Sequence, residues 1–170
     1  MGEERRSLIL SDEEKRITAY HEGGHALVAK LLPGTDPVHK VTIIPRGRAL
    51  GVTMQLPEGD RHGYSKAFLQ NNLMVLLAGR VAEEIIFDTI TTGAGNDIER
   101  ATGMARKMVC EWGMSDVVGP MTIGEQGEEV FIGRDWGHAR NYSEDTARIV
   151  DAEIKKLVET ARENCHKLLQ

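Results

Sequence analysis

The sequence predicts a mainly α-helical fold with one or two small β-hairpins. Three observations indicate the helical class: long segments with apolar residues at helical spacing, capping residues before those segments, and strand-like runs confined to short stretches. The chain has 170 residues, of which 41% are hydrophobic, and this is enough to bury the core of one domain. We expect that domain to span residues 11–170.

The first predicted helix spans residues 12–32. Ser11 and Glu14 fit the Ser-x-x-Glu pattern of a capping box, and a Pro-Gly pair ends the segment. His21 and His25 lie on the face that we expect to pack against the rest of the domain. The other residues of this face recur at spacings of three and four: Ile17, Tyr20, Gly24, Val28 and Leu31.

Residues 38–57 predict a β-hairpin. Two β-rich runs flank a glycine-containing turn, and prolines stand only at the ends of the runs, where they remove no hydrogen bond from the ladder. The second run contains Gly51, Val52 and Thr53, and an exposed edge there could bind an extended peptide through main-chain hydrogen bonds. The alternative is a hairpin that only packs against the helices.

Three more helices are expected. Ser65 is predicted to cap one of about 20 residues, with an apolar face formed by Leu69, Leu73, Leu76 and Leu77. Residues 91–95 predict a flexible loop, after which Gly95 or Asn96 caps a helix that runs toward Trp112.

The C-terminal part is expected to be irregular and then helical. Residues 114–142 are rich in glycine, and short apolar pieces within them allow a second small hairpin. Ser143 then begins a last helix that ends near Leu169. Its predicted apolar face comprises Ile149, Val150, Leu157, Val158, Ala161, Cys165 and Leu168.

Composition excludes several classes of function. The chain has 21 Lys and Arg against 26 Asp and Glu and carries no long basic cluster, so we expect no binding to nucleic acid. Its two cysteines are far apart and belong to no Cys-x-x-Cys pair, which indicates neither a structural zinc site nor a secreted disulfide scaffold. No apolar run is long enough for a membrane span, so the fragment is expected to be soluble.

The segment His21-Glu22-Gly23-Gly24-His25 matches the pattern His-Glu-x-x-His on a predicted helix. Residues four apart share a helix face, so both imidazoles can reach one metal ion, while Glu22 can reach a metal-bound water. Two histidines and one carboxylate would leave a fourth position open, as in catalytic zinc sites. The alternative is a helix with two partly buried, hydrogen-bonded histidines. Paired glycines are unfavourable inside a helix and indicate a close approach of the backbone.

A third ligand must come from elsewhere in the chain. The downstream acids are Glu83, Glu84, Asp88, Asp97 and Glu99, and spacing alone does not choose among them. Asp97 is attractive because it follows a glycine-containing loop that can bring the start of one helix close to another. Its alternative role is that of an ordinary acid in a first turn, where the helix dipole favours negative charge.

Longer segments carry a more specific signal. In chain order they read TAYHEGGHALVAKLLPGTDPVHKVTIIPRGRALGVT, LPEGDRHGYSK, GRVAEEIIF, TTGAGNDIERAT and CEWGMSD. Together they resemble the FtsH family of membrane-anchored, ATP-dependent zinc metalloproteases, and the resemblance extends from about Ser11 through nearly the whole chain. It implies that His21, His25 and Asp97 bind one Zn²⁺ per chain and that Glu22 is the general base. Glu83 resembles a family acid that does not bind zinc itself but holds a zinc-binding histidine in place.

The resemblance also implies parts that lie outside this sequence. Residues 1–10 would be a linker remnant from an upstream AAA ATPase module, and ATP would act only through that module because the chain has no Gly-x₄-Gly-Lys-Ser/Thr motif. The implied partners are unfolded polypeptides, membrane-protein substrates and further copies in a homo-hexamer. Membrane contact would come through absent segments, at the cytoplasmic face of the bacterial inner membrane.

Two other functions are compatible with parts of the sequence. One is an oligomerisation or scaffold module whose long last helix packs against neighbours. The other is an inactive homologue that only binds peptides, and the presence of Glu22 weighs against it because the catalytic acid of the motif is intact.

Overall fold

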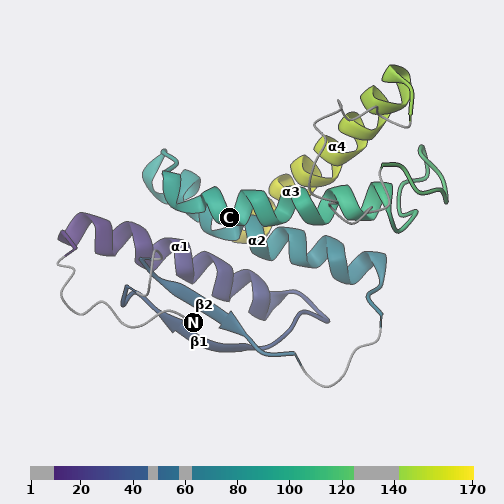
Figure 1. Ribbon diagram of the computed structural model, residues 1–170. Helices are drawn as coiled ribbons and strands as arrows, with labels where there is room; N and C mark the ends of the chain where they lie inside the picture. Colours follow the sequence, from purple (N-terminus) through teal and green to yellow (C-terminus); the bar gives the residue numbers. More distant parts are fainter. Residues whose placement is uncertain (1–9, 46–49, 58–62, 125–141) are drawn as a thin grey trace, which may run out of the picture.

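Helices dominate the structure, a computed structural model that describes residues 10–45, 50–57, 63–124 and 142–170. The predicted mainly α-helical class is confirmed. In Figure 1, α1 lies between the β-hairpin and α2, and α3 and α4 lie on the far side of α2. The elements are α1 (Asp12–Leu31), β1 (Val38–Thr42), β2 (Val52–Gln55), α2 (Lys66–Phe87), the 3₁₀ helix η1 (Thr92–Ala94), α3 (Gly95–Cys110) and α4 (Glu144–Leu169).

Side-chain caps begin three of the helices at the predicted residues. The Ser11 hydroxyl accepts a hydrogen bond from the Glu14 amide, and the Glu14 carboxylate accepts one from the Ser11 amide at 2.8 Å, which completes the capping box of α1. Ser65 and Ser143 each accept from the amide three residues on, at the starts of α2 and α4. Such a cap contributes about 0.5–2 kcal/mol and fixes where the helix begins.

The central helix is α2, which packs against α1, α3 and α4. Half of its 22 residues are buried, so it has no solvent-facing side along most of its length. Its predicted apolar face is confirmed, since all four members are buried: Leu69, Leu73, Leu76 and Leu77.

Two of the predicted apolar faces are wrong in part. Tyr20 and Leu31 are 41% and 52% exposed on α1, and Ile149 is 44% exposed on α4. The buried stripe of α1 instead runs through Thr18, His21, Glu22, His25, Val28 and Ala29, and Tyr20 and Leu31 lie beside it. On α4, Val150 and Ile154 are buried while Ile149 lies beside that stripe.

The segment predicted as a flexible loop over residues 91–95 is instead ordered as η1, which runs directly into α3. The prediction that Gly95 or Asn96 caps this helix is wrong, because α3 begins at Gly95 and its N-cap is Ala94. Ala94 is buried, and this burial fixes the turn against the core.

The predicted hairpin is confirmed. β1 and β2 pair antiparallel, with Val41 opposite Thr53 and Thr42 opposite Val52. The second hairpin expected within residues 114–142 falls mostly on residues 125–141, which lie outside the described residues, as do residues 1–9 of the expected linker. Along the described ranges, no helix is both long and apolar enough to cross a membrane.

A close contact between α1 and α2 forms at Gly24. A Cβ atom on this residue would lie 2.6 Å from the carbonyl oxygen of Ala78 and 2.8 Å from Cβ of Ala82, both on α2. At Gly23 the same test finds nothing within 4 Å. Of the two glycines in the motif, only Gly24 is required by the close approach that the sequence indicated.

We predict opposite effects for alanine at these two neighbours. Gly24→Ala should lower the free energy of unfolding by about 1–3 kcal/mol, because the added methyl forces α1 and α2 apart. Gly23→Ala should leave it unchanged or raise it by up to about 1 kcal/mol, because alanine favours the helix interior. Urea unfolding of the metal-free chain measures both, and equal losses in the two variants would contradict the contact.

Candidate metal centre

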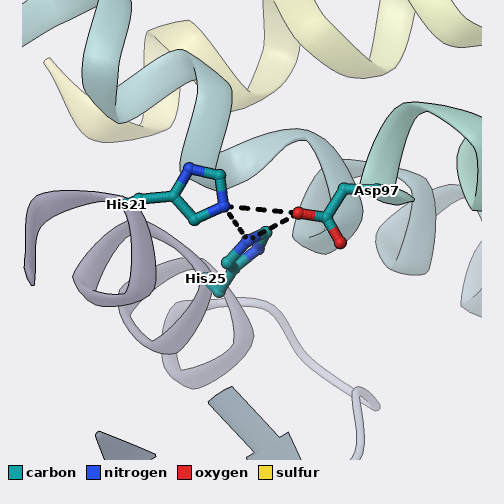
Figure 2. Close-up of side chains that lie close together, drawn as sticks. All are labelled: His21, His25 and Asp97. Atoms are coloured by element: carbon teal, nitrogen blue, oxygen red, sulfur yellow. Dashed lines mark hydrogen bonds and ion pairs between the residues drawn. The ribbon is translucent and has the colours of Figure 1, made fainter. Parts of the chain in front are cut away.

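His21 and His25 lie one turn apart on α1, and both rings face Asp97 in the first turn of α3 (Figure 2). The two Nε2 atoms are 3.1 Å apart. The Asp97 Oδ2 atom lies 3.3 Å from Nε2 of His21 and 3.2 Å from Nε2 of His25. The fold therefore brings the three residues implied by the family resemblance into one triangle.

The opposite ring nitrogens are held by acceptors. Nδ1 of His21 lies 2.7 Å from Oε1 of Glu83, and Nδ1 of His25 lies 2.6 Å from the carbonyl oxygen of Val75. A carboxylate and a carbonyl can only accept, so each Nδ1 carries the proton and donates it. In the neutral rings both Nε2 atoms then present lone pairs toward Asp97.

This arrangement fits a tetrahedral metal ion. Zinc bonds of 2.0–2.1 Å at tetrahedral angles place neighbouring ligand atoms about 3.3 Å apart. The separations in the triangle are 3.1 to 3.3 Å. Three lone-pair atoms at these distances repel one another unless a proton or a metal ion lies among them. Within the described part of the chain, no other trio of His, Cys, Asp or Glu side chains has a metal-binding arrangement.

The electrostatics of the buried triangle also favour positive charge. Burial lowers the pKa of His21, but the neighbouring carboxylates of Asp97 and Glu83 outweigh it and raise this pKa above its ordinary value. Burial likewise opposes ionisation of Asp97, but when the two rings also carry a proton on Nε2, their hydrogen bonds and positive charge hold the pKa of Asp97 well below the usual range. The site is therefore suited to an ionised carboxylate beside a cation.

Glu83 links three parts of the site. It is 1% exposed, and its carboxylate accepts hydrogen bonds from Nδ1 of His21, from the Thr91 amide at 2.8 Å and from the Thr91 hydroxyl at 3.2 Å. It thereby ties α2 to α1 and to the turn that precedes Asp97. This position matches the orienting role that the resemblance implies for it.

The other acids considered as third ligands lie elsewhere. Glu84 pairs with Arg80 on its own helix and Arg162 on α4. Asp88 is the C-cap of α2, and Glu99 is exposed on α3.

Two contributions to the site were not predicted from the sequence. A Cβ atom on Gly79 would lie 2.5 Å from ring atoms of His21, so a glycine is required where the imidazole packs on α2. The only sequence signal is an isolated glycine inside a strongly helical, apolar segment. The Val75 carbonyl that orients His25 has no sequence signal, because it belongs to the backbone.

The triangle opens into a cleft of about 1370 Å³. Glu22 lines the cleft next to the two histidines, and its side chain is buried against β2. Gly51, Val52 and Thr53 also line the cleft, on the side where β2 packs against Glu22. The predicted base and the predicted peptide-binding strand therefore face the same space as the metal triangle.

Comparison with known proteins agrees with this geometry. The profile of peptidase family M41 matches residues 8–170. The chain belongs to this family. As a member of M41 it is a metalloendopeptidase domain, and the histidine pair and carboxylate described above supply a donor set that suits zinc.

Relatives of the M41 domain bear the names expected from the resemblance. The chain is 59% identical over 169 residues to the ATP-dependent zinc metalloprotease FtsH of Acidobacterium capsulatum, covering 99% of this chain and 26% of that protein. It is 57% identical to the ATP-dependent zinc metalloprotease FtsH 1 of a Thermoanaerobacter species, covering 99% and 28%. The chain spans about a quarter of the length of the curated relatives it matches.

We predict that Glu83→Gln weakens zinc affinity by about 10- to 100-fold, because an amide cannot accept all three of the hydrogen bonds that Glu83 receives from His21 and Thr91. Competition with a chromophoric chelator measures the affinity, and circular dichroism checks that the variant is folded. The matched control is Glu84→Gln, the next residue, which faces Arg80 and Arg162. An equal loss in both variants, or none in Glu83→Gln, would contradict the orienting role.

Proposed function

We propose that the domain hydrolyses peptide bonds of unfolded polypeptides with one Zn²⁺ held by His21, His25 and Asp97. The observation that carries the proposal is the buried triangle of lone-pair atoms, spaced for tetrahedral zinc and open to a cleft beside Glu22. When bound, zinc supplies Lewis-acid activation of water and of the scissile carbonyl. The remaining steps belong to side chains of this chain.

Glu22 is the proposed general base. Its carboxylate lines the cleft beside the metal triangle, within reach of a water that attacks the substrate carbonyl. The carboxylate takes a proton from that water and then delivers it to the leaving amine nitrogen. Glu22 is therefore an ionised carboxylate again at the end of each cycle.

The proposed substrate-binding residues are Gly51, Val52 and Thr53, which form the start of β2 and the residue just before it. Among the described residues β2 pairs only with β1, so its other edge offers main-chain donors and acceptors. Its residues line the cleft, which supports the addition of an extended peptide along this edge. Main-chain recognition tolerates many side chains and suits a protease that degrades varied unfolded proteins.

The proposal extends to a longer protein. The relatives are named ATP-dependent zinc metalloproteases and are about four times as long as this chain. We infer a parent protein in which an AAA ATPase module, joined through residues 1–10, uses ATP to unfold substrates and deliver them to this site. The parent would be a homo-hexamer anchored at the cytoplasmic face of the bacterial inner membrane, acting in quality control of unfolded and membrane proteins.

Glu22→Gln tests the base. The variant should retain one zinc per chain, because the ligands are unchanged, while cleavage of a permanently unfolded protein should fall by about 10²- to 10⁴-fold. Metal analysis and a fluorescent unfolded-substrate assay on the same preparation measure the two quantities. Activity within twofold of the parent chain would rule out Glu22 as the base.

Asp97→Ala tests the third ligand. Removal of its carboxylate should abolish stoichiometric zinc binding and activity together, and the control Glu99→Gln, two residues further on the same helix, should keep both. Treatment of the parent chain with a strong chelator should likewise stop cleavage, and added Zn²⁺ should restore it. Full zinc occupancy in Asp97→Ala would show that another group completes the site.

A further inference from the structure

The hydroxyl of Thr53 contacts Glu22 twice. Its Oγ1 lies 2.5 Å from Oε2 of the Glu22 carboxylate and 3.1 Å from the Glu22 carbonyl oxygen. An ionised carboxylate and a carbonyl only accept hydrogen bonds, so the hydroxyl must donate its single proton toward Glu22. Oε2 is the nearer acceptor. This contact joins β2 directly to the proposed base of α1.

Gly51 contacts the same side chain from two residues away. A Cβ atom at this position would lie 2.7 Å from Cγ of Glu22, 2.9 Å from its Oε1 and 2.7 Å from Cγ2 of Thr18. Gly51 immediately precedes β2, and its backbone and the Thr53 side chain both contact Glu22 of α1. The backbone at Gly51 therefore packs against the stem of Glu22, while Thr53 binds its tip.

We propose that Thr53 is a positioning residue for the general base. Its hydroxyl fixes Oε2, and the bare backbone at Gly51 confines the methylene groups, so the carboxylate is held in one orientation. Oε1 is then the oxygen left to take the proton of the attacking water. This inference rests on the proposed function, in which Glu22 is the base.

The arrangement also couples base and substrate. Thr53 lies in the strand proposed to bind the peptide main chain, so one short strand would fix both the carboxylate and the register of the scissile bond. A fixed orientation of the Glu22 carboxylate relative to the substrate speeds the chemical step in the enzyme–substrate complex and leaves substrate affinity unchanged, because the orientation matters at the transition state. The effect of losing the hydroxyl should therefore appear in kcat.

Thr53→Val and Thr53→Ser test this in the zinc-loaded 170-residue chain. Valine keeps the branched shape without the hydroxyl and should lower kcat by about 10- to 100-fold, with KM and zinc content unchanged. Serine keeps the hydroxyl and should restore most of kcat. The matched control is Thr42→Val in β1, whose hydroxyl bonds the Ile44 amide instead. A loss confined to KM or zinc content, or no rescue by serine, would overturn the positioning role.

A second measurement decides the contact without relying on activity. Urea midpoints of the metal-free chain are compared for Thr53→Val, Glu22→Ala and the double variant. If the hydroxyl binds the carboxylate, Thr53→Val should lower the midpoint more in the parent chain than in the Glu22→Ala background. Equal shifts in both backgrounds would overturn the proposed contact. A parent chain that cleaves no substrate would instead refute the proposed function, while this comparison still tests Thr53.

Discussion

The close approach of α1 and α2 is the constraint on which the site depends. At Gly24 α1 has no side chain, which admits the carbonyl of Ala78, and at Gly79 α2 has none, which admits the ring of His21. Because neither Gly24 nor Gly79 has a side chain, α1 and α2 lie close enough for Glu83 and the Val75 carbonyl to reach the histidines. A wider separation would remove both hydrogen bonds that orient the rings. Packing between helices thus determines the geometry of the candidate metal site.

Each element contributes one kind of group to the site. α1 carries both histidines and Glu22, α2 supplies the acceptors behind the rings, and η1 delivers Asp97 at the start of α3. Glu83 joins these parts because it bonds both His21 and the turn at Thr91. This hydrogen-bond network and the core around α2 hold Nε2 of both histidines and the Asp97 carboxylate close together. A bound cation would remove the repulsion between their lone pairs.

The parts of this account that were predictable from sequence are local. Ser11, Ser65 and Ser143 mark helix starts because a capping hydroxyl acts within three residues, and the spacing of His21 and His25 needs only one helical turn. The exposure of Tyr20 and Leu31 was missed because the apolar spacing was read as one face, whereas the buried stripe of α1 is centred on the polar residues Thr18, His21, Glu22 and His25 and continues to Val28 and Ala29.

The non-local parts required either the family resemblance or the structure. Spacing left Asp97 among five acids, and only the resemblance singled it out before the fold placed it beside the histidines. The site requires Gly79 to make room for the His21 ring and the Val75 carbonyl to orient His25. Both requirements arise from contacts between helices that are far apart in sequence. Thr53 was expected only in the peptide-binding strand, and its contact with Glu22 depends on how the hairpin packs on α1.

The central claim is that helix packing presents three atoms, Nε2 of His21, Nε2 of His25 and one carboxylate oxygen of Asp97, to a single zinc ion. Crystallography of the zinc-loaded chain at the zinc absorption edge tests it most directly. The account predicts one anomalous peak about 2.0–2.1 Å from each of these atoms, with Nδ1 of His21 still bonded to Glu83. Zinc bound through Nδ1, or through Glu83 in place of Asp97, would contradict it.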